Sequence, residues 1–425
     1  MTLSDVPFSP IMIFVFVTGY ALIALEHVTK VNKTTIALIT AVLLWGLQFE
    51  NPALSKERNM DLLVGYLGDI SQVIFFLIGA LTIVEIISAH KGFNIISDLI
   101  QFRSKRKLFW IMGILAFFLS SVLDNLTTTI VMVTLLTHLV DEGKERWLIG
   151  AGVVIAANAG GAWTPIGDVT TTMLWIGGQI STTNIIVALF IPSVVCFIAA
   201  FLALTPSLKG DFPDKALHFK ADKKEPYSAC IFTLGITSLI MVPILKIVVG
   251  MPPFLGIFLG VSLMWLLTDL VHEAYEDRAH LRVPHVLTKI DMSGVLFFLG
   301  VLLSIEALEA AGILSNLAIF FDKTLKHTDL IAVIIGIASA IVDNVPLVAA
   351  AMSMYPLTEF PQDNRFWELI AYAAGTGGSM LIIGSAAGVV FMGLEKVPFG
   401  WYLKRITLPA MIGYFAGIAA YLLIG

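Results

Sequence analysis

The sequence is short of charged residues and of long polar connections, and both shortages exclude a soluble protein. Only 13% of its 425 residues are charged, about half the ~25% that is typical of a soluble domain. By contrast, 57% are hydrophobic and the mean hydropathy is +0.89. The longest polar connections, Thr205 to Tyr227 and His272 to Lys289, are too short for an independent core. We therefore expect the whole chain to lie in a lipid bilayer.

Cysteine is also scarce. Cys196 and Cys230 both lie in apolar runs, without a CxxC pattern or a histidine partner, so we expect neither a disulfide framework nor a metal centre. The first ten residues, MTLSDVPFSP, contain no Lys or Arg, whereas a cleaved signal peptide begins with basic residues. We expect Met1 to Leu25 to be retained as a first membrane span.

Signatures of nucleotide binding are missing from the glycine-rich strings. The string GGAWTPIGD, from Gly160 to Asp168, lacks the Gly-Lys-Ser/Thr ending of a phosphate loop. The string GTGGSM, from Gly375 to Met380, lacks the preceding strand of a dinucleotide fingerprint. We expect no cofactor and no nucleic-acid partner.

Long apolar runs, separated by short polar stretches, recur from one end of the chain to the other, for example Ile70 to Ser88, Ile185 to Leu204 and Ile406 to Ile424. Such runs are typical of transmembrane helices. With the N-terminus placed outside, most of the 26 Lys and Arg residues fall on the inner connections, as the positive-inside rule requires. The sequence therefore predicts an all-α polytopic membrane protein.

Three blocks of sequence occur twice in the same order. DISQVIFFLIG (from Asp69) matches DMSGVLFFLGV (from Asp291), SSVLDN matches SAIVDN, and AANAGGAWTPIGD matches AAGTGGSMLIIGS. The offset falls only from 222 to 217 residues, which indicates a duplicated unit. Five crossings are expected between the two Asp-Asn motifs, and an odd number inverts the second half, as in many secondary transporters.

The repeats divide the chain into four expected parts. These are N-terminal scaffold spans (1–68), a first inverted repeat (69–205), a linker loop with further scaffold spans (206–290) and a second inverted repeat (291–425).

Each repeat is expected to contain a re-entrant helical hairpin and a broken transmembrane helix. The motif Asp124-Asn125 interrupts an apolar stretch whose arms, Leu108 to Leu123 and Leu126 to Val140, are each about 15 residues or ~22 Å long, short of the ~30 Å hydrocarbon core. In the second repeat, Pro346 follows Asp343-Asn344 and is expected to break the helix. Hairpins that enter from opposite sides would bring their tips together at mid-depth.

Intramembrane carboxylates are the strongest functional signal, since each costs at least ~2.5 kcal/mol to insert. Asp124 and Asp343 occupy matching repeat positions, which favours a transport role over the alternative that each is a buried helix cap. Asp168 has Ser385 as its repeat mate, so we expect an asymmetric site with three carboxylates.

Paired glycines in both glycine-rich strings are expected to break a helix in mid-span and to free carbonyl oxygens. The expected site combines the carboxylates with these carbonyls and with amides and hydroxyls, which are hard donors suited to Na⁺ or a proton. For the glycines, close helix packing is an open alternative. The expected ion-binding and proton-exchanging residues are Asp124, Asn125, Thr127, Thr128, Asn158, Gly160, Gly161, Thr164, Asp168, Asp343, Asn344, Gly377, Gly378 and Ser385.

Four further titratable residues lie on, or at the ends of, the expected first helices of the two repeats. Glu85 is followed five residues later by His90, and a histidine near a membrane surface is a candidate pH sensor, although an interfacial residue without a role is the alternative. Asp69 and Asp291 are expected to be N-caps at the starts of their helices.

The paired strings SSVLDNLTTTIVM and NAGGAWTPIGDVTT, repeated as SAIVDNVPLVAAAM and GTGGSMLIIGSAAG, closely resemble the NhaD-type bacterial sodium/proton antiporters. These belong to the ion transporter superfamily, with the divalent-anion/sodium symporters and arsenite permeases, and the likeness covers essentially the whole chain. The resemblance implies a homodimer in the bacterial cytoplasmic membrane, with a fixed scaffold and a mobile hairpin-bearing domain that moves as an elevator. EIISAHKGF, from Glu85 to Phe93, is similar to a segment linked to pH response in that family.

The expected function is exchange of Na⁺ or Li⁺ for H⁺, with Na⁺ bound at Asp124, Asp343 and Asp168. One alternative is a carrier of dicarboxylate or arsenite from the same superfamily. In the sodium-coupled anion symporters the hairpin tips read Ser-Asn-Thr, and aspartates in place of those serines favour a cation. A remote alternative is an intramembrane aspartyl protease, which also uses two carboxylates, but its Gly-x-Gly-Asp string is missing before Asp168. We therefore expect a transporter and not an enzyme.

Overall fold

The computed structural model describes the chain except for residues 1–8, 25, 53, 98–103, 213–224, 326 and 425. Within these described residues the regular elements are helices, apart from one isolated bridge between Ser104 and Asp211. The predicted all-α class is confirmed. The expected first span at Met1 to Leu25 lies partly outside the described residues, and its helix there begins at Ser9.

The first half of the chain contains α1 (Ser9–Ala24), α2 (Glu26–Thr29), α3 (Lys33–Phe49), α4 (Lys56–Ala89), α5 (Asn94–Ser97), α6 (Lys105–Leu123), α7 (Asn125–Leu139), α8 (Lys144–Gly161), α9 (Val169–Ile176), α10 (Thr182–Leu204) and the short η1 (Thr205–Ser207).

The rest contains α11 (Ser228–Val249), α12 (Pro253–His272), η3 (Glu276–Leu281), α13 (Val283–Val286), η4 (Leu287–Lys289), α14 (Met292–Ala310), α15 (Ile313–Leu325), α16 (Thr328–Ala338), α17 (Asn344–Met354), α18 (Arg365–Gly377), α19 (Ala386–Glu395), α20 (Phe399–Arg405) and α21 (Thr407–Ile424).

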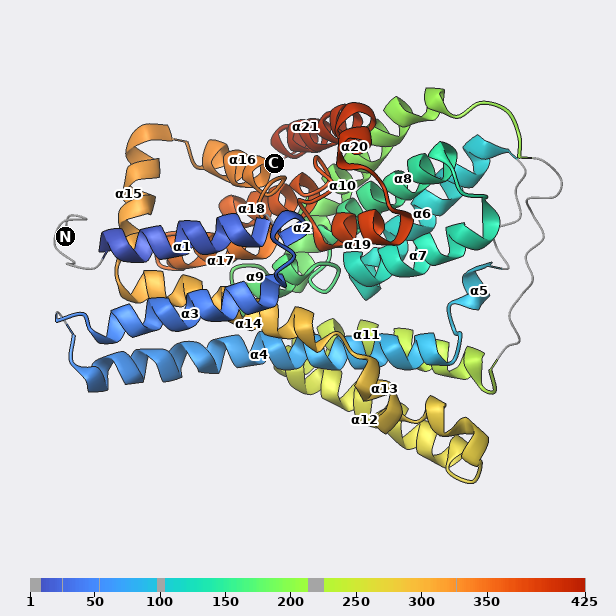
Figure 1. Cartoon of the computed structure of the whole chain (residues 1–425), viewed down its shortest axis with the longest axis horizontal. Helices are drawn as coiled ribbons and strands as arrows, with labels where there is room; N and C mark the ends of the chain where they lie inside the picture. Colours follow the sequence, from blue (N-terminus) through green and yellow to red (C-terminus); the bar gives the residue numbers. More distant parts are fainter. Residues whose placement is uncertain are drawn as a thin grey trace.

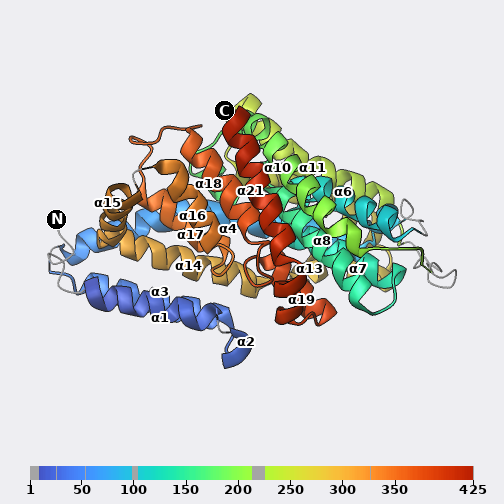
Figure 2. The same cartoon turned by 90° about the horizontal axis from the view of Figure 1, so that it is seen from above.

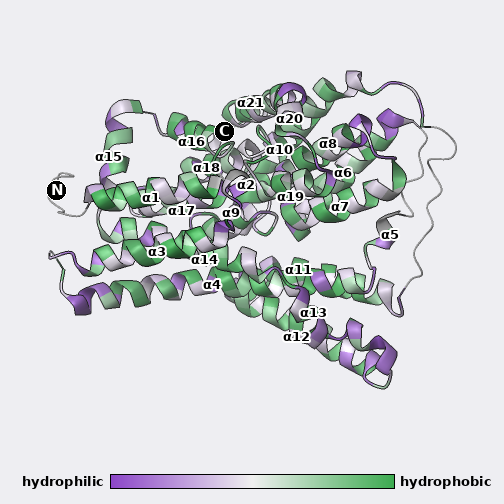
Figure 3. Ribbon diagram, viewed as in Figure 1, coloured by the Kyte–Doolittle hydropathy of each residue, from purple (hydrophilic) through white to green (hydrophobic). Residues whose placement is uncertain are grey.

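Seven helices in the described part are long and apolar enough to cross a membrane: α4, α6, α10, α11, α12, α14 and α21. Figure 3 shows apolar residues along most helices, with polar residues gathered at ends such as the start of α4 and the connection after α12. The chain is therefore a multi-pass membrane protein.

Helices α1, α3, α4 and α14 form a frame along one side of the molecule (Figure 1). The start of α3 is fixed to α14, since Thr34 Oγ1 donates to Ser293 O at 2.8 Å, and Trp45 Nε1 donates to Leu303 O at 2.9 Å further along. Helix α4 has 34 residues and is capped by Ser55. The N-cap expected at Asp69 is therefore wrong, because Asp69 lies inside α4, and the helix runs through the expected part boundary at 68/69.

Two helical pairs point toward each other from opposite ends of the molecule. Figures 1 and 2 both place α6 and α7 at one end and α16 and α17 at the other, with the breaks between each pair facing the middle. Helix α6 has 19 residues, longer than the expected arm, because Lys105 to Lys107 belong to its first turn. Re-entry and the inverted relation of the halves stay predictions.

Between the hairpins lie two interrupted helices, one from each half. Helix α8 ends at Gly161 and the chain resumes as α9 at Val169, while α18 ends at Gly377 and resumes as α19 at Ala386. Both breaks fall in the glycine-rich strings, as the sequence predicts. Helices α10 and α21 pack against each other beside them.

Candidate functional site

The tip of the first hairpin is a one-residue break at Asp124. Its φ of 96° is rare for a residue with a side chain, and it ends α6 and caps α7. The cap uses both carboxylate oxygens, which accept from Thr127 N and Thr127 Oγ1 at 2.8 Å each. Asp124 is therefore a helix cap, the alternative left open by the sequence, and it also lines an internal cavity.

Asp168 begins the second half of the first interrupted helix. Its Oδ1 accepts from Thr170 N and Thr170 Oγ1 at 2.9 Å each, and Thr171 completes a capping box. The side chain is only 2% exposed. A carboxylate at a helix N-terminus faces the positive end of the helix dipole, so α9 stabilises negative charge here.

The second half of the chain also has a helix break within its hairpin and an interrupted helix, but a neutral serine takes the place of one carboxylate. Ser385 caps α19 by accepting from Gly388 N at 3.1 Å, so it takes the place that Asp168 has in the first half. Asp343 precedes α17 and makes no side-chain cap. The expectation that Pro346 breaks the helix is wrong: the break lies before it, and Pro346 stands in the first turn of α17, where a proline does not disturb the helix.

Asn125 and Asn344, one from each hairpin tip, meet at Asp168. Asn125 Nδ2 donates to Asp168 Oδ2 at 2.6 Å, and Asn344 Nδ2 approaches the same carboxylate at 3.3 Å. Asn158 extends the network by accepting from Asn125 at 3.0 Å and donating to Ser385 Oγ at 3.0 Å. One hydrogen-bond network thus joins both hairpins and both interrupted helices.

A cavity adjoins this network. Its walls include Asp124, Asn125, Asp168, Asp343 and Asn344, with apolar side chains of α4 and α14 opposite. The three predicted carboxylates, and Asp291 at the start of α14, therefore line one small space inside the molecule. Since amides and carboxylate oxygens are ligands of hard cations, the chemistry of the walls suits a small cation.

The predicted threonines have different positions. Thr127 bonds Asp124, whereas Thr164 Oγ1 donates to Ser121 O at 2.7 Å and so ties the first break to α6. Thr128 Oγ1 is buried and, among the described residues, has no hydrogen-bond partner. A buried hydroxyl without a partner is costly, and Thr128 is not among the residues that line the cavity.

The predicted glycines lie where two backbones touch. A Cβ on Gly160 would meet Phe117 O, one on Gly377 would meet Gly336 O, and one on Gly378 would meet Gly384 O. Gly161 faces the backbone of Gly167 in the same way. The packing explanation accounts for these glycines, and the carbonyl of Gly377 accepts from Met380 N at 3.0 Å.

Glu85 and His90 lie away from this cavity, near the end of α4. His90 is fully buried, and its Nε2 is 3.0 Å from His272 Nε2, while its Nδ1 bonds Ile86 O at 2.8 Å. Burial lowers the pKa of His90 below its ordinary value. The pair joins the ends of α4 and α12.

Three residues near the site were missed or undervalued from the sequence. Ser379 accepts from Asn158 at 2.9 Å, and Thr170 bonds Asp168 twice; only the repeat match at AAGTGGS pointed to the former. Asp291 caps α14 as predicted, through Gly294 N at 3.0 Å, and it also lines the cavity.

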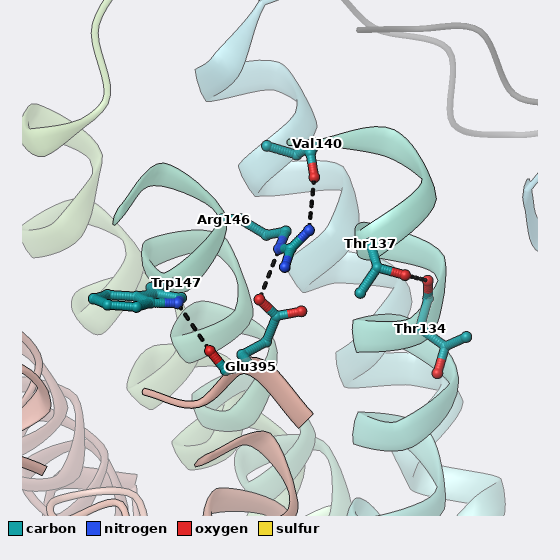
Figure 4. Close-up of polar contacts among 6 residues, drawn as sticks. All are labelled: Thr134, Thr137, Val140, Arg146, Trp147 and Glu395. Atoms are coloured by element: carbon teal, nitrogen blue, oxygen red, sulfur yellow. Dashed lines mark hydrogen bonds and ion pairs between the residues drawn. The ribbon is translucent and has the colours of Figure 1, made fainter. Parts of the chain in front are cut away.

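The two halves are also clamped far from the carboxylates. Figure 4 shows Arg146, at the start of α8, between the carboxylate of Glu395 and the carbonyl of Val140. The Arg146 Nε to Glu395 Oε2 distance is 2.7 Å, and Trp147 Nε1 donates to Glu395 O at 3.1 Å. The end of α19 is thereby fixed to the base of the first hairpin.

Comparison with known proteins adds a family. The model of the family described as "Citrate transporter" (CitMHS) matches residues 20–367. The chain is 50% identical to sodium/proton antiporter 1 of Arabidopsis thaliana, covering 97% of this chain and 72% of that protein, and 49% identical to sodium/proton antiporter 2, covering 97% and 98%. It is 30% identical to the Na⁺/H⁺ antiporter NhaD of Vibrio cholerae, covering 97% and 91%.

Proposed function

The chain belongs to the ion transporter superfamily, in the branch of the NhaD-type sodium/proton antiporters, and we propose that it exchanges Na⁺ or Li⁺ for H⁺ across a membrane. The relatives are named as transporters and antiporters, so its class is that of a membrane transporter.

The observation that carries the proposal is the cavity into which Asp124, Asp168 and Asp343 all face. A citrate carrier, which the name of the matching family suggests, must bind a substrate with several negative charges. Carboxylates around the space would repel that substrate, and the repulsion is strong where water is excluded. The same oxygens would attract Na⁺, Li⁺ or a proton.

The proposed exchange needs only competition for these oxygens. Na⁺ bound between the carboxylates would displace protons, and protons bound on them would exclude Na⁺. The hairpins and interrupted helices would carry the bound ion past the frame of α1, α3, α4 and α14 in an elevator-like, alternating-access movement. Hydrogen bonds from Asn125 and Asn344 to Asp168 support movement of both hairpins as one unit.

The test measures a pH gradient in everted vesicles or proteoliposomes that contain the full chain. Added Na⁺ or Li⁺ should dissipate a preformed gradient, and Asp124→Asn or Asp343→Asn should abolish this response. Asp141→Asn, on the exposed connection after α7, makes the same chemical change outside the cavity and should leave it intact. If citrate and not Na⁺ moves protons, or if both cavity variants stay active, the proposal is wrong.

Three further expectations belong to the proposal. The resemblance supports a homodimer, which the mass of the purified protein in detergent would test. The relatives are from a plant and from bacteria. From the resemblance to the bacterial antiporters, we propose the bacterial cytoplasmic membrane as the location. His90 and Glu85 stay candidates for pH sensing, to be tested by the pH profile of exchange in His90→Gln and Glu85→Gln.

A further inference from the structure

A second cavity adjoins the carboxylate site from the side of the loop between α1 and α3. Its volume is about 240 Å³. The frame contributes Tyr20, Lys33 and Phe297, and α2 contributes Glu26. The rest of the lining comes mainly from the break before α17 and from α19 with the residues that precede it. Asp343 lines this cavity as well as the first one, so it forms part of the wall between them.

Lys33 brings a positive charge to this cavity. It is the first residue of α3, and its Nζ lies 4.4 Å from the centre of the Phe297 ring, over its face. Its backbone N–H donates to Glu26 Oε1 at 3.1 Å, but in the described part of the chain no carboxylate lies within ion-pair distance of the Lys33 ammonium. An aromatic face attracts a cation, so Phe297 holds the ammonium at the cavity wall.

The frame keeps Lys33 at this place. Asn32 caps α3 by accepting from Thr34 N at 2.8 Å, and Thr34 Oγ1 donates to the backbone of Ser293 on the neighbouring α14. The lysine therefore stands on the frame, whereas Asp343 stands on the hairpin that we propose to move. Any movement of the hairpin changes the separation of these two charges.

The remaining polar groups of this cavity exclude a plain anion site. Glu26 and Asp343 line this cavity together with Lys33, and two carboxylates would repel an anionic ligand. The Tyr20 hydroxyl is buried and, within the described residues, has no hydrogen-bond partner. The cavity is thus lined by two carboxylates, two hydroxyls (Tyr20 and Ser385) and one ammonium. A cation that enters it must approach against the positive charge of that ammonium.

We propose that Lys33 is a tethered cation that sets the affinity for sodium, by repelling the transported cation from the approach to Asp343 and by balancing that carboxylate when sodium is away. This inference rests on the proposed function. A binding site that holds its cation too tightly releases it slowly, and a fixed positive charge of the protein weakens binding without changing the ligands.

The test is the dependence of exchange on Na⁺ concentration in proteoliposomes. Lys33→Gln should lower the KM for Na⁺ about fivefold, the effect expected when one nearby charge is removed from a partly screened site. The yield of folded protein should not fall by a similar factor. Lys33→Arg keeps the charge and should keep the KM. Lys30→Gln is the matched control, because Lys30 is exposed in the same loop and its loss changes the surface charge equally.

Several results would overturn the inference. An unchanged KM in Lys33→Gln with a reduced maximal rate would mean that Lys33 only supports the fold, as would equal defects in the Arg and Gln variants. A similar change in Lys30→Gln would assign the effect to surface potential. If wild-type vesicles show no Na⁺-driven proton movement, the proposed exchange is refuted, and the role of Lys33 with it. If the wild type exchanges normally, the Lys33 variants test the role of Lys33 alone. If Lys33→Gln does not fold, Lys33→Met provides the same charge removal.

Discussion

Asp168 receives hydrogen bonds from both hairpin tips, through Asn125 and Asn344, and from Thr170 of its own helix. This one carboxylate connects the two halves of the chain at the residue scale. Its repeat mate is the neutral Ser385, so only the first of the two interrupted helices brings a carboxylate to the cavity, while the second half contributes Asp343 from its hairpin tip.

Replacing Asp168 with Asn should raise the KM for Na⁺ at least about tenfold, because hydrogen bonds and ion contacts to a charged group contribute roughly 1.5–3 kcal/mol. The new amide would also face the donor Nδ2 of Asn125. Concentration-dependent exchange in proteoliposomes measures the effect. Asp61→Asn, on an exposed part of α4, serves as the control, and an unchanged KM in Asp168→Asn would remove Asp168 from the ion site.

The buried His90–His272 pair predicts a pH dependence of stability. Burial lowers the pKa of His90, so the folded protein binds fewer protons there than the unfolded chain does. Stability from this site is complete above the unfolded pKa of about 6.5 and is lost as the pH falls below it. Lys91, Glu225 and His280 add nearby charge.

The Tm of the purified protein should therefore fall when the pH is lowered below about 6.5, and His90→Gln should flatten that dependence. Thermal unfolding in detergent across this pH range is the measurement. His327→Gln replaces an exposed histidine and should leave the slope unchanged. An identical slope in His90→Gln would contradict the role of the pair.

Helix interruption is the feature that matters at the scale of elements. Beside the breaks before α9 and α19, glycines let neighbouring backbones approach closely: Gly377 lies against Gly336, and Gly160 lies against Phe117. Each close approach leaves no room for a Cβ. A larger residue at these positions would therefore push the neighbouring helices apart, besides changing the end of its own helix.

Gly377→Ala should destabilise the protein by about 1–3 kcal/mol, the usual cost of overpacking, because its Cβ would meet the carbonyl oxygen of Gly336. We expect a low yield of monodisperse protein and a lower Tm. Gly393→Ala is the control, since nothing lies within 4 Å of a Cβ there. Equal stability of the two variants would show that α16 and α18 can separate freely.

At the scale of the whole molecule, the hairpins and interrupted helices must hold together if they move as one body. The Arg146–Glu395 pair supplies one such connection, with side-chain exposures of 13% and 0%. Breaking a buried ion pair from one side leaves an unpaired buried charge and costs about 3–5 kcal/mol.

Arg146→Ala and Glu395→Ala should each lower stability by that amount, while the double variant should cost clearly less than their sum. Unfolding measured for the four proteins gives the coupling free energy. The Lys105–Glu145 pair, in which Glu145 is 50% exposed, should give a coupling of only about 0–1 kcal/mol. Additive effects at Arg146 and Glu395 would mean that the pair does not clamp the halves.

The sequence by itself determined the membrane class, the helix breaks at Asp124 and at both glycine-rich strings, and the pairing of Asp168 with Ser385, because hydropathy and repeated motifs are local properties. It misplaced the helix start at Asp69 and the break at Pro346, since both depend on where neighbouring helices pack. Only the tertiary structure decided that Asn125 and Asn344 meet at Asp168, 43 and 176 positions away in the sequence, and that Lys33 lines the same cavity as Asp343, because separate helices must pack together before these residues become neighbours. Such neighbours cannot be read from positions in the sequence, because the packing of the frame against the hairpins determines which side chains meet.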